Sequence, residues 1–314
     1  ILNENRMSIS RNKGAFASYL ARVRISEGYR RWKRRTKSVL RHIPLIGRPL
    51  ENLISALKDQ IKRRFYTLNY FEALGLYYLG PVDGNDPVAV ERALGEAKRF
   101  GKNVLVHVIT KKGKGYEPAE HAPEAYHNVA PCEKPASTFH SVAVEELCKE
   151  AEKDPKIVAI TAAMSGGTGL YRFGERFPER YFDVGIAEEH ALTFAAGLAA
   201  GGMHPYPVIY STFLQRAYDN ILHDVALQHL PVRMLIDRAG LAVADGATHH
   251  GIFDVAFLSE IPGVRILSPM TYGTLLAAMR QIRTTEEPVA LRYPNTDEDP
   301  AVRQAFYPKE DYGA

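Results

Sequence analysis

Polar and aromatic side chains with the chemistry for acid–base work follow two predicted strands. Glu188 comes after the apolar pair Ile186 and Ala187, where a strand is predicted to turn into a helix. A carboxyl there can share a proton with a ring nitrogen of a ligand, although stabilisation by the helix dipole accounts equally well for an acidic residue. Phe213, which follows Tyr210-Ser-Thr, either offers a flat face to a heteroaromatic ring or packs in the core.

Basic side chains at other predicted strand ends suit phosphate binding. Arg238 and Arg292 end two strands, where they form either a guanidinium fork for a phosphate or surface salt bridges. Asp245-Gly-Ala-Thr-His-His-Gly251 offers too few ligands for a closed zinc site and favours hydrogen bonds to substrate oxygens. Lys111-Lys-Gly-Lys-Gly-Tyr116 is either a diphosphate-binding turn or an ordinary basic turn, and it lacks the order of a Walker A loop.

The elements predicted around these residues alternate between helix and strand. Asp86 caps a helix that ends at Gly101, after a turn-rich loop at 80–86 and before a buried strand at 104–109. Beyond a polar loop at 113–137, helices are expected near 138–152, from 189, near 214–228 and from 271, with strands at 157–160, 181–186, 208–210, 232–236, 264–267 and 289–293. This order predicts an α/β fold with a doubly wound parallel sheet, which binds ligands at the carboxyl ends of its strands.

Length and composition bound the class of protein. With 314 residues, 46% of them hydrophobic, the chain is long enough for about two globular domains and is unlike a disordered or fibrous sequence. The sequence holds no apolar run long enough for a membrane helix. Cys132 and Cys148 have no metal-like spacing, which favours a reducing, cytoplasmic environment over a disulfide framework. The opening Ile-Leu-Asn is interpreted as the end of a buried strand, and the chain as a piece of a longer protein.

The charge is unevenly distributed along the chain. Residues 11–64 contain 16 Lys and Arg against 3 Asp and Glu, whereas the net charge of the whole chain is +4. We interpret this segment as a solvated, partly helical arm, so neither a nucleic acid nor a membrane is expected as a partner. Binding of nucleic acid through the arm is the alternative, and steep salt dependence would indicate it.

Seven runs of sequence stand out along the chain: ILNENRMSIS, GPVDGND, TKKGKGYEPAE, YFDVGIAEEHALTFAAGLA, YSTFLQRAYDNILHDVALQ, IDRAGLAVADGATHHGIFD and LRYP. Together they resemble the 1-deoxy-D-xylulose-5-phosphate synthase family, whose members are thiamine-diphosphate enzymes of the transketolase-like superfamily. The resemblance extends in order from residue 1 to about residue 294. Two departures are Ala-Glu-Glu-His where the family has Ala-Glu-Gln-His, and Arg-Tyr-Pro-Asn-Thr where it has Arg-Tyr-Pro-Arg-Gly.

The resemblance implies a domain organisation and an assembly. Two thiamine-diphosphate-binding-type domains, each a doubly wound parallel sheet, are expected, the first of them incomplete. Residues 1–131 correspond to the C-terminal part of the diphosphate-binding domain with its basic arm, 132–298 to the pyrimidine-binding domain, and 299–314 to a linker toward a further domain. A homodimer is expected, as is usual in the family.

The resemblance also assigns roles to individual residues. Glu188 is expected to bind N1′ of the aminopyrimidine of thiamine diphosphate, and Phe213 to stack on that ring. Arg216 and Ile186 line the same pocket, Lys112 contacts the cofactor, and Asn5 and Met7 bind Mg²⁺. The substrate pocket is expected to contain His127, Tyr210, Arg238, Asp245, His249 and Arg292, with the two arginines on the phosphate of the substrate and His127, Asp245 and His249 taking part in catalysis.

The implied reaction joins pyruvate to D-glyceraldehyde 3-phosphate. Pyruvate loses CO₂, and the product is 1-deoxy-D-xylulose 5-phosphate, a precursor of isoprenoids, thiamine and pyridoxal. Two alternatives stay open beside this transferase. One is another transketolase-like ketoacid enzyme, such as the β subunit of a ketoacid dehydrogenase. The other is a noncatalytic module, because the aspartate of the family's metal motif is absent from the chain.

Overall fold

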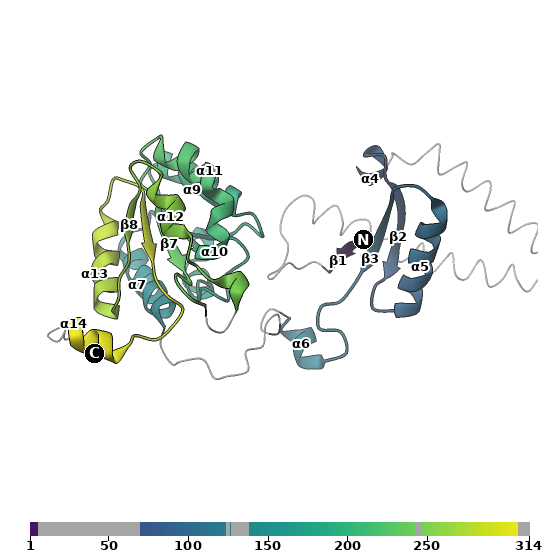
Figure 1. Ribbon diagram of the computed structural model, residues 1–314, viewed down its shortest axis with the longest axis horizontal. Helices are drawn as coiled ribbons and strands as arrows, with labels where there is room; N and C mark the ends of the chain where they lie inside the picture. Colours follow the sequence, from purple (N-terminus) through teal and green to yellow (C-terminus); the bar gives the residue numbers. More distant parts are fainter. Residues whose placement is uncertain (6–69, 124–125, 127–137, 243–245, 307–314) are drawn as a thin grey trace, which may run out of the picture. The chain divides into compact units, whose positions relative to one another are not determined.

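The computed structural model describes residues 1–5, 70–123, 126, 138–242 and 246–306. These residues belong to two compact units that divide after Pro123 (Figure 1). The basic arm at 11–64 lies outside the described residues, as do Met7, His127 and Asp245.

The first unit is a three-stranded parallel sheet in the order β1-β3-β2. Its helix α5 (Pro87–Phe100) is confirmed as predicted, because the Asp86 carboxylate accepts hydrogen bonds from Val88 and Ala89 and Gly101 ends the helix at φ 62°. The strand predicted at the opening is present as Leu2–Glu4, but Ile1 precedes it and is exposed, so the prediction of a buried strand that includes Ile1 is wrong. The other elements are β1 (Leu2–Glu4), β2 (Tyr77–Asp83), β3 (Val104–Ile109), α4 (Tyr70–Ala73) and α6 (Glu117–His121).

Strand β2 corrects the prediction of a loop at residues 80–86, because the strand runs on to Asp83. Its pairing with β3 is irregular between Leu79 and Val82, where Gly80 and Pro81 interrupt the register. Proline is tolerated there because β2 is an edge strand, which has one side without ladder partners. A Cβ on Gly80 would lie 2.5 Å from the His107 carbonyl oxygen, so the close approach of the two strands requires glycine.

The second unit contains a six-stranded parallel sheet in the order β5-β4-β6-β7-β9-β8. The predicted doubly wound sheet is therefore confirmed, with every neighbouring pair parallel. The strands are β4 (Ile157–Thr161), β5 (Tyr181–Asp183), β6 (His204–Tyr210), β7 (Arg233–Asp237), β8 (Arg265–Leu267) and β9 (Val289–Arg292).

Helices cover both faces of this sheet (Figure 1). Alternation along β7 divides the core, because Leu235 packs with one cluster while Met234 and Ile236 pack with the other. One face carries α7 (Phe139–Lys153), α8 (Tyr171–Arg176) and α13 (Tyr272–Arg283); the other carries α9 (Glu188–Ala200), α10 (Ser211–Leu214) and α12 (Asp254–Ser259). Helix α14 (Pro300–Phe306) follows the sheet.

The continuous helix predicted near 214–228 is wrong in detail. The chain there passes from α10 through a 3₁₀ turn at Gln215–Ala217 and the short α11 (Tyr218–Asn220) into a π-helix at Ile221–Ala226. π-helical segments occur often at functional sites, and this one begins after the short α11 that separates it from Phe213 and Arg216.

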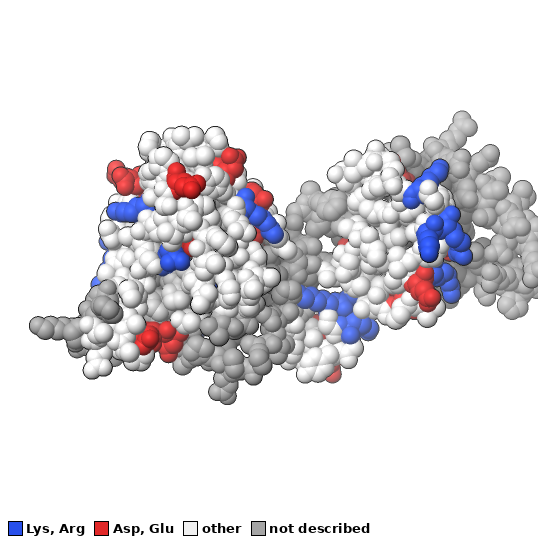
Figure 2. Space-filling model, in the orientation of Figure 1, with Lys and Arg blue, Asp and Glu red and all other residues white. Residues whose placement is uncertain are grey.

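On the face of the second unit that Figure 2 shows, basic and acidic residues are interspersed among uncharged ones. Lys and Arg gather over α5 of the first unit. Within the described ranges, no helix combines the length and the apolar character that crossing a bilayer demands.

Candidate functional site

The candidate site lies where the strands of the second unit end. Because β5, β6, β7 and β9 are parallel, the segments that follow them meet at one edge of the sheet. From β4 the chain continues to β5 on one side of the sheet, and then to β6 on the other side of β4. Such a switch point between neighbouring strands forms a ligand-binding crevice in parallel sheets. A Cβ on Gly167, after β4, would lie 1.6 Å from the Tyr210 hydroxyl, so the two segments are in close contact at this point.

Glu188 is the first residue of α9 and is 1% exposed. Its Oε2 accepts a hydrogen bond of 2.9 Å from Nη1 of Arg216, so the positive charge of the guanidinium lies beside the carboxylate. The turn before α9 is shaped by Asp183, whose Oδ1 accepts from the backbone N–H groups of Ala163 and Gly185. Ile186, in the same turn, is 58% exposed. The structure thus brings the predicted Glu188 and Arg216 together as an ion pair.

Three ring side chains lie together beyond β6. The Phe213 ring is stacked on Tyr210 with centroids 5.8 Å apart, and meets the His249 ring edge-on at 5.5 Å. The Tyr210 and His249 centroids are 6.4 Å apart. Thr212 holds the segment of His249 in place by donating to the Thr248 carbonyl at 3.0 Å. The predicted Tyr210, Phe213 and His249 therefore form one cluster.

Arg238 covers the tyrosine of this cluster. Its guanidinium carbon lies 4.0 Å from the Tyr210 ring centroid, and its backbone has φ 60°, a left-handed conformation that is uncommon for a residue with a side chain. Burial raises the pKa of Tyr210 to about 12, with Arg238 acting in the opposite direction. Burial, with a smaller effect of Arg238, lowers the pKa of His249, which favours a neutral imidazole near pH 7.

A buried carboxyl, that of Asp237, ends β7 directly before Arg238. Asp237 is fully buried; its Oδ1 accepts from the Arg238 backbone N–H at 2.7 Å, and its Oδ2 has no hydrogen-bond partner in the described structure. Burial raises the pKa of Asp237 to about 7, although Arg238 opposes the shift. Burial also raises the pKa of Tyr293, and the charge of Asp237 adds to that rise.

Stability should therefore depend on the protonation of Asp237. Because the pKa in the folded state is the higher one, folding favours the protonated acid, and stability should fall as pH rises from about 4 to about 7. As pH rises through this window, we expect the free energy of unfolding of Asp237→Asn to increase relative to that of the wild type by roughly 2–4 kcal/mol. Urea unfolding at a series of pH values measures this difference. The control is Asp219→Asn, whose carboxylate is exposed. Parallel pH profiles for wild type and Asp237→Asn would contradict the prediction.

Arg292 ends β9 and forms an ion pair with Asp254. Arg292 Nε and Nη2 donate to the two carboxylate oxygens of Asp254 at 2.8 and 3.2 Å, and Asp254 is 0% exposed. Asp254 is not among the site residues that the sequence predicts. An aspartate that begins a helix just after the glycine-bounded histidine segment was the available signal, but it is also an ordinary helix-start residue.

The remaining predicted residues are located elsewhere or not described. Asn5 follows β1 and Lys112 lies in the turn after β3, so both belong to the first unit and are considered apart from Glu188. That turn is closed by Glu120, which pairs with Lys111 and accepts from the Gly115 backbone N–H at 2.9 Å; these contacts lower the pKa of Glu120 to about 2. Met7, His127 and Asp245 lie outside the described residues.

The residues around Glu188 fit an aminopyrimidine ring better than the described residues fit a metal. The buried carboxyl beside Arg216 offers the hydrogen bond that such a ring needs, and Phe213, three residues before Arg216, offers the flat contact. Among the residues described, no group of three His, Cys, Asp or Glu side chains is placed to hold a metal ion. Of the two magnesium ligands that the sequence predicts, only Asn5 lies among the described residues.

Comparison with known proteins defines the class to which this fold and site belong. Residues 137–297 match the family model described as transketolase, pyrimidine binding domain. Since this match takes in about half of the chain, the chain belongs to that family.

The more particular similarity is to 1-deoxy-D-xylulose-5-phosphate synthase. Residues 1–110 match the family model of that description. The chain is 48% identical over 305 residues to the synthase of Desulfitobacterium hafniense, and 46% identical over 302 residues to that of Syntrophomonas wolfei. Each match takes in 94% of this chain but only 48% and 47% of the relative, so the chain spans about half the length of the curated relatives it matches.

A solved structure described as a split gene transketolase, inactive beta4 tetramer, is also similar. It is 26% identical, with a TM-score of 0.48 over 57% of each chain.

Proposed function

We propose that this chain supplies the pyrimidine-binding site of a thiamine-diphosphate-dependent enzyme that condenses pyruvate with D-glyceraldehyde 3-phosphate to give 1-deoxy-D-xylulose 5-phosphate and CO₂. The observation that carries the proposal is the buried carboxyl of Glu188, ion-paired with Arg216 at the same sheet edge as the ring cluster of Tyr210, Phe213 and His249. The cofactor, when bound, supplies the electron sink that lets pyruvate lose CO₂.

Glu188 would hold a proton at a ring nitrogen of the cofactor. Its burial at 1% exposure excludes water from the contact, which strengthens a hydrogen bond between the carboxyl and the ring. Arg216, attached to Oε2, fixes the orientation of the carboxyl group. Phe213 and Ile186 would supply the apolar walls of the same pocket.

The substrate would lie between the ring cluster and the strand ends of β7 and β9. His249 is suited to accept a proton from a substrate hydroxyl, because its lowered pKa favours the neutral imidazole. Arg238 would place a positive charge beside the phosphate of the aldehyde substrate, and Arg292 would donate hydrogen bonds to that phosphate. His127 and Asp245 are proposed for the same pocket by family resemblance, as is Lys112 for the cofactor.

The wider organisation belongs to the same proposal. Residues 1–131 would form part of a diphosphate-binding domain, 132–298 the pyrimidine-binding domain and 299–314 a linker. Mg²⁺, bound by Asn5 and the Met7 carbonyl, would accompany the diphosphate. We further propose a homodimer in the cytoplasm.

Calorimetric titration with thiamine diphosphate, with and without Mg²⁺, tests the proposal directly. We expect binding by the folded chain that weakens about tenfold or more in Phe213→Ala, because the ring loses its stacking partner. The matched control is Phe182→Ala, which removes a partly exposed phenylalanine that packs on Phe194 away from the ring cluster. Equal affinities for Phe213→Ala and wild type would contradict the assignment of the pocket. Turnover of pyruvate and D-glyceraldehyde 3-phosphate is then assayed by product formation.

A further inference from the structure

The guanidinium of Arg292 is fixed on one side by Asp254. Two parallel hydrogen bonds, Nε to Oδ2 at 2.8 Å and Nη2 to Oδ1 at 3.2 Å, form a fork that permits a single orientation. Asp254 is 0% exposed and the Arg292 side chain 17% exposed, so water competes little for these bonds. The Asp254 carboxylate also neutralises the charge of Arg292. This arginine therefore contributes hydrogen bonds to a ligand rather than net positive charge.

The other donors of Arg292 point to Ser268 and Gly251. Nη2 donates a second bond to the Gly251 carbonyl at 3.4 Å, and Nη1 donates to the Ser268 Oγ at 3.3 Å. A guanidinium has five N–H groups, so within the described residues one N–H of Nη1 is left beyond these contacts. The Ser268 oxygen accepts from Nη1, and in the part of the chain that the structure describes its own proton has no acceptor, so it can be donated to a ligand.

The sheet places Ser268 and Arg292 side by side. Strands β8 and β9 pair in parallel with Leu267 opposite Leu291, so the next residues, Ser268 and Arg292, are adjacent where the two strands end. Ser268 is exposed. Arg238 is linked to the same place, because a Cβ on Gly251 would lie 2.3 Å from the Arg238 carbonyl oxygen while the Gly251 carbonyl accepts from Arg292.

We propose that Asp254 is a positioning residue that holds Arg292 so that its Nη1 and the hydroxyl of Ser268 together bind an oxygen of a phosphate monoester. Ser268 is then a further contact for the phosphate, and Arg238 supplies the charge that the Asp254–Arg292 pair lacks. This inference rests on the proposed function only in taking the phosphate to be that of the aldehyde substrate.

The test follows the Arg292 Nε–H signal by NMR in the chain labelled with ¹⁵N-arginine, titrated with inorganic phosphate. Arg292→Lys assigns the signal by deleting it. In the wild type we expect a slowly exchanging signal that shifts with phosphate. Asp254→Asn should lose the slow exchange and bind phosphate about tenfold or more weakly, because the amide cannot accept both guanidinium bonds.

Ser268→Ala separates the phosphate contact from the positioning. This exposed substitution should keep the slow exchange of Arg292 and weaken phosphate binding by about two- to tenfold. The control is Ser259→Ala, an exposed serine on α12 that bonds its own helix. Unchanged or tighter phosphate binding in Asp254→Asn would overturn the positioning role, and an Arg292 signal indifferent to phosphate would overturn the subsite. These readouts need no turnover, so failure of the proposed reaction is distinguishable from failure of this inference.

Discussion

Replacing Glu188 with Gln is expected to lower turnover of pyruvate by about 10²–10⁴-fold while thiamine diphosphate stays bound. The amide has nearly the same shape as the carboxyl, so it can still fill the pocket at the start of α9. It cannot carry the exchangeable acid proton, and it also loses the charge that pairs with Arg216 at 2.9 Å. Product formation and calorimetric affinity, measured on the same preparation of the protein that carries these residues, provide the test.

The neighbouring acid Glu189 provides the matched control for this prediction. Glu189 lies next to Glu188 on α9 but is exposed, so Glu189→Gln should leave turnover within about twofold of the wild type. If Glu188→Gln retained full activity, Glu188 would have no part in proton transfer. If it abolished cofactor binding as well, its role would be in holding the ring rather than in the chemistry.

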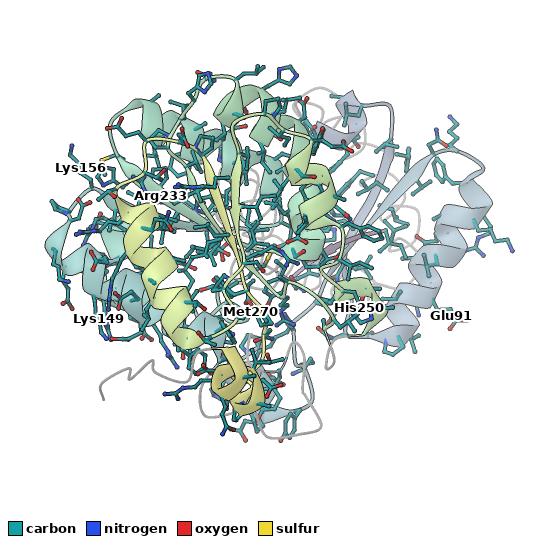
Figure 3. All side chains as sticks on the ribbon, turned by 60° about the vertical axis from the view of Figure 1, so that its left-hand side comes forward. Glu91, Lys149, Lys156, Arg233, His250 and Met270 are labelled. Atoms are coloured by element: carbon teal, nitrogen blue, oxygen red, sulfur yellow. The ribbon has the colours of Figure 1, made fainter. Side chains whose placement is uncertain are left out.

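Replacing Arg233 with Met is expected to cost on the order of 3–4 kcal/mol of unfolding free energy. Arg233 is 2% exposed at the beginning of β7, toward the opposite end of the sheet from Met270 (Figure 3). Its guanidinium donates to four backbone carbonyls at 2.8–3.2 Å, two of them from the last residues of α13. Methionine fills similar space without a donor, so these buried carbonyls would lose their partners.

Urea unfolding of Arg233→Met and of the control Arg280→Met measures how much the buried carbonyl contacts of Arg233 contribute to the free energy of unfolding. Arg280 lies on α13 with a side chain 68% exposed and a long contact of 3.8 Å to Glu146, so its loss should cost under about 1 kcal/mol. Comparable destabilisation in the two variants would show that the carbonyl contacts of Arg233 contribute little. Burial lowers the pKa of Arg233, yet the guanidinium keeps its charge at neutral pH.

The candidate site was predictable where residue type and strand ends coincide. Tyr210, Phe213 and Arg238 follow strands that the apolar runs indicate, and the structure brings all three together. The pairing of Arg292 with Asp254 was not predictable, because the two residues are 38 positions apart and only folding brings the start of α12 to the end of β9. The same holds for Arg233, which the sequence gives no reason to place against carbonyls 49–52 positions away.

By itself the sequence determined the local elements, such as α5 between Asp86 and Gly101, and the parallel character of the sheet. Caps and hydrophobic alternation are local properties, and short-range physics is enough to express them. Only the tertiary structure decided the strand order, the continuation of β2 through Gly80 and Pro81, and the partner of each buried charge. These features depend on contacts between distant segments, where the cost of burying a charge is offset only by the partner that folding brings to it.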